Sequence, residues 1–79
     1  MLVQAIFDFV NAADWDVSWR VVEAKQALLF RPEVEALFAQ FIQQAKEEGR
    51  ERIVRILEVH LALLRDCRRD GIEEAFARL

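Results

Sequence analysis

The sequence predicts an all-α fold in a single domain, with four main helices followed by a short C-terminal helix at residues 72–79. Hydrophobic residues recur at the i, i+3, i+4 spacing of helices along almost the whole chain. Gly and Pro interrupt this pattern at only three points, Pro32, Gly49 and Gly71. The length of 79 residues suits one domain. We therefore expect antiparallel helical hairpins, arranged as a tetratricopeptide-like array or as a bundle.

The first two helices are expected at residues 2–12 and 15–29. Asp14 stands between them and has the side chain of an N-cap, which accepts hydrogen bonds from the exposed N–H groups of a helix start. On a helical wheel of about 100° per residue, the apolar arc of residues 2–12 spans about 220°, more than one neighbour can cover. Residues 15–29 carry two opposed apolar faces, which is typical of a helix that lies between two layers.

The third and fourth helices, expected at residues 32–48 and 50–70, form the hairpin that the sequence predicts most directly. The third helix begins with Pro32 in its first position and is apolar on one face only, with Phe41 at the centre of that face. Gly49 can adopt the left-handed conformation that ends a helix, and so short a turn requires antiparallel helices. The apolar arc of the fourth helix again spans about 220°. This width predicts a central helix that is covered from more than one side.

Charge and hydropathy exclude several functional classes. The chain has 14 acidic and 11 basic side chains, a net charge of −3, and its basic residues are dispersed. A nucleic-acid interface needs a basic patch, so we expect no nucleic acid among the partners. The apolar runs are far shorter than the roughly 20 residues that cross a bilayer, and no Lys or Arg precedes Arg20 to form the start of a signal peptide. We therefore expect a cytoplasmic protein without a membrane partner.

Three side chains are candidates for chemistry. His60 is the only histidine, and aliphatic side chains stand three and four residues from it, so we expect no metal or cofactor and interpret it as a core histidine hydrogen-bonded to a neighbour. Cys67 lies two turns, about 10 Å, further along the helix, too far for a thiolate–imidazole pair. Ser18 has no histidine near it in the sequence. A small hydrolase that uses His60 and Cys67 is a remote alternative to a protein that is not an enzyme.

Trp15 and Trp19 stand one helical turn apart and allow two interpretations. The two indoles could form an aromatic platform for a ligand, or they could contribute to the core. Aromatic pairs at this spacing are more often buried, so the core interpretation is favoured while the platform stays open.

Four segments of the chain resemble a helical segment of bacterial multidomain proteins. They are residues 11–15 (NAADW), 18–23 (SWRVVE), 27–29 (ALL) and 55–76 (RILEVHLALLRDCRRDGIEEAF). In cyanobacteria and related phyla this segment stands beside tetratricopeptide repeats and, in some proteins, beside CHAT-type caspase-like domains. The resemblance implies a helical scaffold module within a larger protein, with no catalytic residues to carry over. The tetratricopeptide consensus W-x2-L-G-x2-Y is itself absent, and the chain has no Tyr.

These observations predict a non-catalytic module for protein–protein interaction or scaffolding, with a homo-oligomerisation domain as the alternative. Hydrophobic residues make up 54% of the chain, a high share for its length, which favours some apolar surface reserved for a partner. We expect that surface where the first two helices meet, and a symmetric homodimer would bury it. The expected interface residues are Leu2, Phe9, Val17, Val21 and Leu28.

Overall fold

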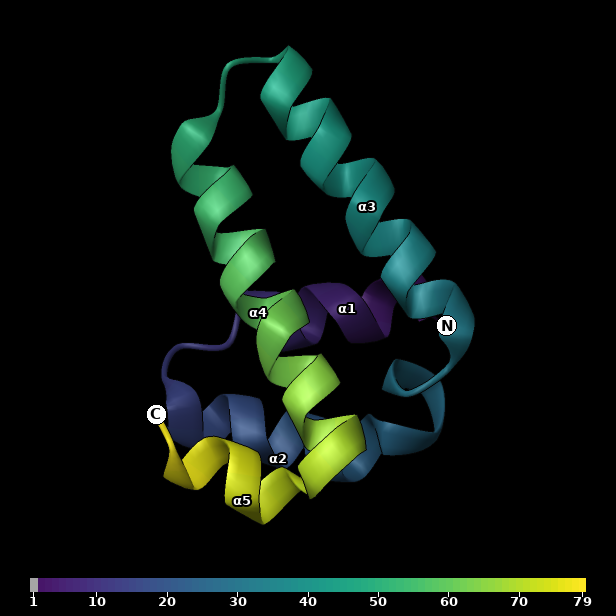
Figure 1. The fold of residues 1–79 in the computed structure, drawn as a ribbon, viewed down its shortest axis with the longest axis vertical. Coiled ribbons are helices and arrows are strands. Elements are labelled where there is room, and N and C mark those ends of the chain that lie inside the picture. The colour runs from purple at the N-terminus through teal and green to yellow at the C-terminus, as the bar shows by residue number, and fades with distance from the viewer. Residues whose placement is uncertain (1) are drawn as a thin grey trace.

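The computed structural model describes residues 2–79 and folds them into five α-helices (Figure 1). The helices are α1 (Leu2–Val10), α2 (Trp15–Leu29), α3 (Pro32–Glu47), α4 (Glu51–Asp70) and α5 (Ile72–Ala77). The all-α prediction is confirmed, and each helix begins and ends within two residues of its expected bounds. Among the described residues, no helix is long and apolar enough to cross a membrane.

α3 and α4 form the predicted antiparallel hairpin around Gly49. This glycine adopts a φ of 72°, and its N–H donates to the carbonyl of Lys46 at 3.1 Å. The N–H of Arg50 donates to the carbonyl of Ala45 at 2.8 Å, which completes a Schellman ending of α3. From this turn the two helices spread apart toward their other ends (Figure 1).

α1 lies across the open end of the hairpin, where it contacts α2, α3 and α4 (Figure 1). α2 packs against both α1 and α5, in agreement with its two opposed apolar faces. α5 folds back from α4 at Gly71, which has a φ of 98°. An ion pair of 2.9 Å between Arg78 and Asp70 joins the end of α5 to the end of α4.

The core forms where α1 meets the other helices. Its largest fully buried apolar side chains are Phe9, Phe38, Ile6, Leu29, Val22 and Val34. Ser18 is a buried polar residue in this core, and its hydroxyl donates to the carbonyl of Phe9 at 3.3 Å. The start of α2 is thereby fixed to the end of α1 without an unsatisfied polar group.

Phe41, expected at the centre of the apolar face of α3, is not the best-buried residue of that face. Phe38, one turn nearer the open end, is fully buried, whereas Phe41 is half-buried. Phe41 stacks on the exposed ring of Phe7, with centroids 5.6 Å apart. The reason is that α1 covers α3 near the open end of the hairpin, and the spacing along α3 does not show which turn a third helix will cover.

The expected interface is wrong at Phe9. This side chain is completely buried, because α2, α3 and α4 pack around α1 and cover most of its wide apolar arc, apart from Phe7. The other residues of that expected interface are half-buried: Leu2, Val17, Val21 and Leu28. Leu2, Val21 and Leu28 pack against the core of their own chain. A patch centred on Phe9 is therefore not open to a partner in this structure.

Glu35 links α3 to α4 through charge. It accepts a hydrogen bond from Nε of Arg65, and its Oε2 lies 3.6 Å from Nη1 of Arg68. The hydrogen bond from Arg65 lowers the pKa of Glu35 below its ordinary value of 4.5, against partial desolvation, and the positive charges of both arginines add to the shift. Folding therefore favours the ionised form of Glu35.

Glu35→Gln should make the protein lose less stability in acid. Because the folded pKa of Glu35 lies below the unfolded one, its contribution is present above the unfolded pKa and is lost as the pH falls through the folded pKa. Urea unfolding between about pH 6 and about pH 3 should show a shallower decline for this variant. The matched control, Glu33→Gln, changes a first-turn carboxylate of α3 that forms no ion pair within residues 2–79. Equal declines for Glu35→Gln and the unchanged chain would contradict this role.

Candidate functional site

One face of α4 leaves aliphatic side chains in contact with solvent. Ile53, Ile56 and Val59 are 39%, 40% and 49% exposed. They are spaced three residues apart, so they form one stripe along the helix. Trp15, at the start of α2, is 40% exposed and contacts His60 beside this stripe. We refer to Ile53, Ile56, Val59 and Trp15 together as the α4 strip.

Three aromatic rings connect the α4 strip with the core. The ring of His60 meets the buried ring of Phe9 edge-on, with centroids 4.9 Å apart, and the tilted indole of Trp15 at 5.3 Å. Nδ1 of His60 lies 2.7 Å from the carbonyl oxygen of Ile56. A carbonyl oxygen only accepts, so Nδ1 carries a proton and donates it in this hydrogen bond. This hydrogen bond fixes the orientation of the imidazole ring, which Trp15 contacts.

The backbone around Trp15 is fixed as well. Asp14 is the N-cap of α2, as predicted, and its carboxylate accepts from the backbone N–H three residues on at 2.9 Å. Ser18 lies three residues after Trp15, and its buried hydroxyl donates to the carbonyl of Phe9 at the end of α1. The first turn of α2 therefore has a defined position against α1, and this position places the indole beside His60.

Two open cavities flank the α4 strip. One of about 310 Å³ lies between α4 and the connection from α1 to α2, and its lining residues are Val10, Ala12, Ala13, Asp14, Trp15, Ser18, Ile56 and His60. The other, of about 260 Å³, lies between α4 and α5, and its lining residues are Val59, Ala62, Leu63, Asp66, Ala75, Arg78 and Leu79. Both cavities are lined mostly by apolar side chains, so they extend the apolar surface of the strip.

The first of these cavities contains the residue types of a Ser–His–Asp triad without its connections. Asp14 caps α2, Ser18 donates to a backbone carbonyl, and Nδ1 of His60 donates to the carbonyl of Ile56. No hydrogen bond joins any two of the three side chains within residues 2–79. A serine nucleophile needs a bound base to take its proton, so Ser18 is not activated in this arrangement.

Cys67 is not an activated nucleophile either. Burial raises the pKa of its thiol to about 11, and the negative charge of Asp66 adds to the shift. At neutral pH Cys67 is therefore a protonated thiol in the core, while His60 is held by the carbonyl of Ile56. The structure does not bring together the pair on which the hydrolase alternative depends.

The two indoles do not form a common ligand platform. Trp19 is half-buried and stacks on Phe76 of α5, with centroids 5.3 Å apart and an interplanar angle of 27°. Trp15 instead contacts His60 at the surface. The core interpretation holds for Trp19, and Trp15 belongs to the α4 strip.

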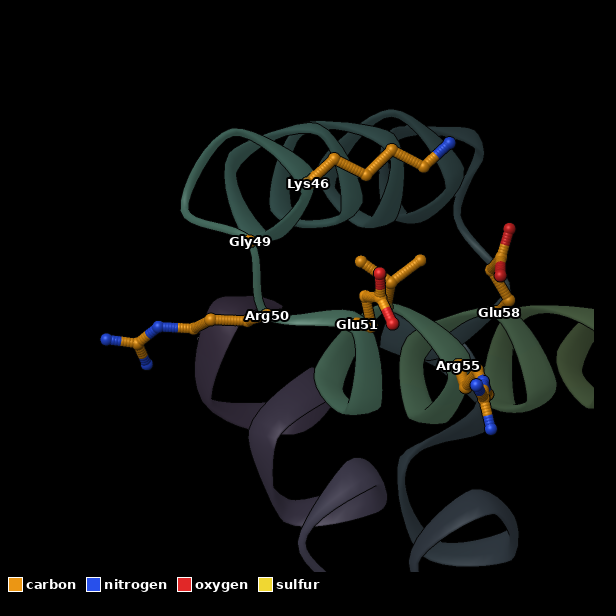
Figure 2. Close-up of a pocket in the computed structure, with 7 residues that line it drawn as sticks. Lys46, Gly49, Arg50, Glu51, Arg55 and Glu58 are labelled. Atoms are coloured by element: carbon orange, nitrogen blue, oxygen red, sulfur yellow. The ribbon is translucent and has the colours of Figure 1, made fainter.

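A third cavity, of about 390 Å³, lies at the turn between α3 and α4 (Figure 2). Its lining residues are Lys46, Gly49, Arg50, Glu51, Val54, Arg55 and Glu58. In Figure 2 Glu51 and Glu58 project from α4 toward α3, which carries Lys46, whereas Arg50 and Arg55 point away. Exposed charges of both signs surround this cavity, so it does not select a ligand of either charge.

No group of three His, Cys, Asp or Glu side chains in residues 2–79 could hold a metal ion. Comparison of the chain with known protein families, with curated proteins and with solved structures finds no match. The function is therefore inferred from the surface itself, where the α4 strip gathers four of the exposed large apolar side chains of residues 2–79.

Sequence reasoning missed the α4 strip although its signal was present. The apolar arc of α4 spans about 220°, and we expected the rest of the chain to cover it. The structure buries the side that carries Leu57, Leu61 and Leu64 and leaves the side that carries Ile53 and Ile56 open. A helix of 20 residues in a chain of 79 has too few neighbours for so wide an arc. A comparison of helix length with the number of available partners would have indicated the strip.

Proposed function

We propose that this chain is a non-catalytic module that binds another protein through the α4 strip. The carrying observation is the exposure of Ile53, Ile56 and Val59 along one helix face, with an open apolar cavity on each side. Contiguous exposed apolar surface on a small domain marks an interaction site. The shape suits a helix of the partner laid along α4, with its apolar side chains entering the two cavities.

The polar groups near the strip support binding rather than chemistry. Each of Asp14, Ser18 and His60 is already engaged with backbone groups, and each helps to hold the surface in place. Cys67 is a buried thiol whose pKa is raised to about 11. The basic residues are dispersed through the chain, which favours a protein over a nucleic acid as the partner.

The proposed setting is a larger, cytoplasmic bacterial protein in which this module serves as a scaffold. The support is the resemblance of residues 11–15 and 55–76 to a segment that stands beside tetratricopeptide repeats. Residues 11–15 contain Trp15, and residues 55–76 contain Ile56 and Val59, so the resembling segments include most of the α4 strip. In such a protein the strip would bind a neighbouring domain or a separate chain.

Selection of helical peptides from a display library, with the folded chain as bait, tests this proposal. The selected peptides should bind at least about tenfold more weakly to Val59→Glu, because the change puts a charge at the centre of an apolar contact. Val59 is half exposed, so the circular dichroism spectrum of this variant should be unchanged. The matched control is Ala39→Glu, at an exposed position of α3, which should bind the peptides normally. A library without binders, or binders indifferent to Val59→Glu, would contradict the proposal.

A further inference from the structure

We infer that the partner of the α4 strip is a second copy of this chain, paired antiparallel about a two-fold axis at Val59. The inference rests on the proposed function and identifies the occupant of the same surface. It follows from the order of charges along the exposed side of α4 and from the shape of the cavity beside Val59.

On the face of α4 that carries Val59, two arginines stand near the beginning of the helix and two aspartates near its end, while Glu51 and the arginines of the last turns lie on its flanks. Arg52 and Arg55 are exposed, and neither forms an ion pair within the described chain. Asp66 and Asp70 stand at the other end. Asp70 is bound by Arg69 and Arg78, whereas Asp66 binds Arg69 at 2.6 Å through Oδ1, which leaves Oδ2 for a second donor. Antiparallel pairing of two such helices brings opposite charges together at both ends, whereas parallel pairing brings like charges together.

Val59 lies midway between the two charged ends. Arg52 precedes it by seven residues and Asp66 follows it by seven, and residues seven apart lie on nearly the same face of a helix. A two-fold axis at Val59 therefore sets Arg52 of one copy opposite Asp66 of the other, and this pair occurs twice. The valines themselves meet on the axis.

The same axis matches a protruding side chain to a cavity. Ile56 and Ala62 stand three residues before and after Val59, so the axis sets Ile56 of one copy opposite Ala62 of the other. Ile56 is 40% exposed, and the small Ala62 lines the cavity of about 260 Å³ together with Val59 and Leu63. Each copy thus supplies one side chain and one receiving cavity, the self-complementary arrangement that a two-fold interface requires.

An unrelated partner would need an acidic end, an apolar middle and a basic end in register with α4. A second copy of this chain supplies that pattern, because in an antiparallel pair its α4 presents the charged and apolar residues in the opposite order. Pairing of two copies also removes two α4 strips from water in one contact.

Sedimentation velocity of the whole chain, from low micromolar to near-millimolar concentration, tests the pairing. The unchanged chain should form a reversible dimer. Arg52→Glu alone sets two acidic pairs across the interface and Asp66→Arg alone sets two basic pairs, so each should weaken dimerisation at least about tenfold. An equimolar mixture of the two variants should restore it, because every charged pair in the mixed dimer again joins opposite signs. A mixture as weak as its components would overturn the pairing.

Arg31→Glu is the matched control for charge. It makes the same change of net charge in the connection between α2 and α3, at the other end of α2 from Trp15 (Figure 1). It should dimerise like the unchanged chain. Glu in the first turn of α4 suits the helix dipole, so Arg52→Glu should fold normally, and circular dichroism checks this for every variant.

Oxidative crosslinking tests the position of the axis. At the usual separation of packed helices, residues on a two-fold axis come within the Cα distance of a disulfide. Val59→Cys should therefore form a covalent dimer on a non-reducing gel, whereas Ala39→Cys on α3 should not. The native Cys67 is buried with a pKa of about 11 and does not compete. Equal crosslinking at both positions would overturn an axis at Val59.

The outcomes separate this inference from the proposed function. A chain that stays monomeric at near-millimolar concentration, while its selected peptides still depend on Val59, overturns the second copy as partner and leaves the α4 strip an interaction surface. A monomeric chain whose peptides ignore Val59 overturns both.

Discussion

Phe9→Glu should leave the chain unfolded at neutral pH. Phe9 is completely buried between α1 and its neighbours, with its ring edge-on to His60. The variant loses this aromatic burial and also places an ionised carboxylate in apolar surroundings, and the two costs together exceed about 5 kcal/mol. Small domains have only about 5 kcal/mol to lose at the low end of their range. Far-ultraviolet circular dichroism should therefore show loss of most of the helical signal.

Val59→Glu is the control for this experiment, because it also replaces an apolar residue by Glu but at a half-exposed position. Its helical signal should match that of the unchanged chain. If Phe9→Glu remained folded, Phe9 would not be a core residue. The sequence-based expectation of an interface at Phe9 would then be correct. Together, the two variants test whether the side chain of Phe9 lies in the core and that of Val59 lies on the surface.

The helices could be predicted because the signals that begin and end them are local. Asp14 binds a backbone N–H of the turn that follows it, and Gly49 adopts the left-handed conformation two residues past the end of α3. Pro32 occupies a position where its missing N–H costs nothing. Each signal acts within about one helical turn, so the rest of the fold cannot change it.

The pairing of helices could not be predicted in the same way. A wide apolar arc states how much surface must be covered but not which helix covers it. α1 and α4 have arcs of the same width, about 220°. Three helices contact α1 and leave Phe7 exposed, whereas α4 keeps the whole row of Ile53, Ile56 and Val59 exposed. We expected the uncovered surface where α1 meets α2, because the arc of α1 is wider than one neighbour can cover. A short helix, however, is the easier one to enclose.

The sequence also could not show how deeply the residues of the candidate site are buried. His60 was expected to be a core histidine hydrogen-bonded to a neighbour, and the hydrogen bond to the carbonyl of Ile56 is confirmed. Its position is only half in the core, because Trp15, which we expected inside, rests on it from the surface. Sequence spacing places His60 on the apolar arc of α4, but the edge of the buried area depends on where the start of α2 lies.

Phe38→Ala should destabilise the fold far more than Phe41→Ala, although both remove the same atoms from the same face of α3. Phe38 is fully buried in the core, and its loss should cost about 3–5 kcal/mol. Phe41 is half-buried against the exposed ring of Phe7, so its loss should cost about 1–2 kcal/mol. Urea unfolding monitored by circular dichroism measures both free energies under one set of conditions.

The comparison of the two variants tests where α1 crosses the hairpin. Helix propensity changes equally in both, so it cancels in the difference between them. What remains is the difference between the full burial of Phe38 and the partial cover that Phe7 of α1 gives to Phe41. If Phe41→Ala proves the more costly change, the crossing lies nearer the turn at Gly49, as a hairpin core centred on Phe41 would require.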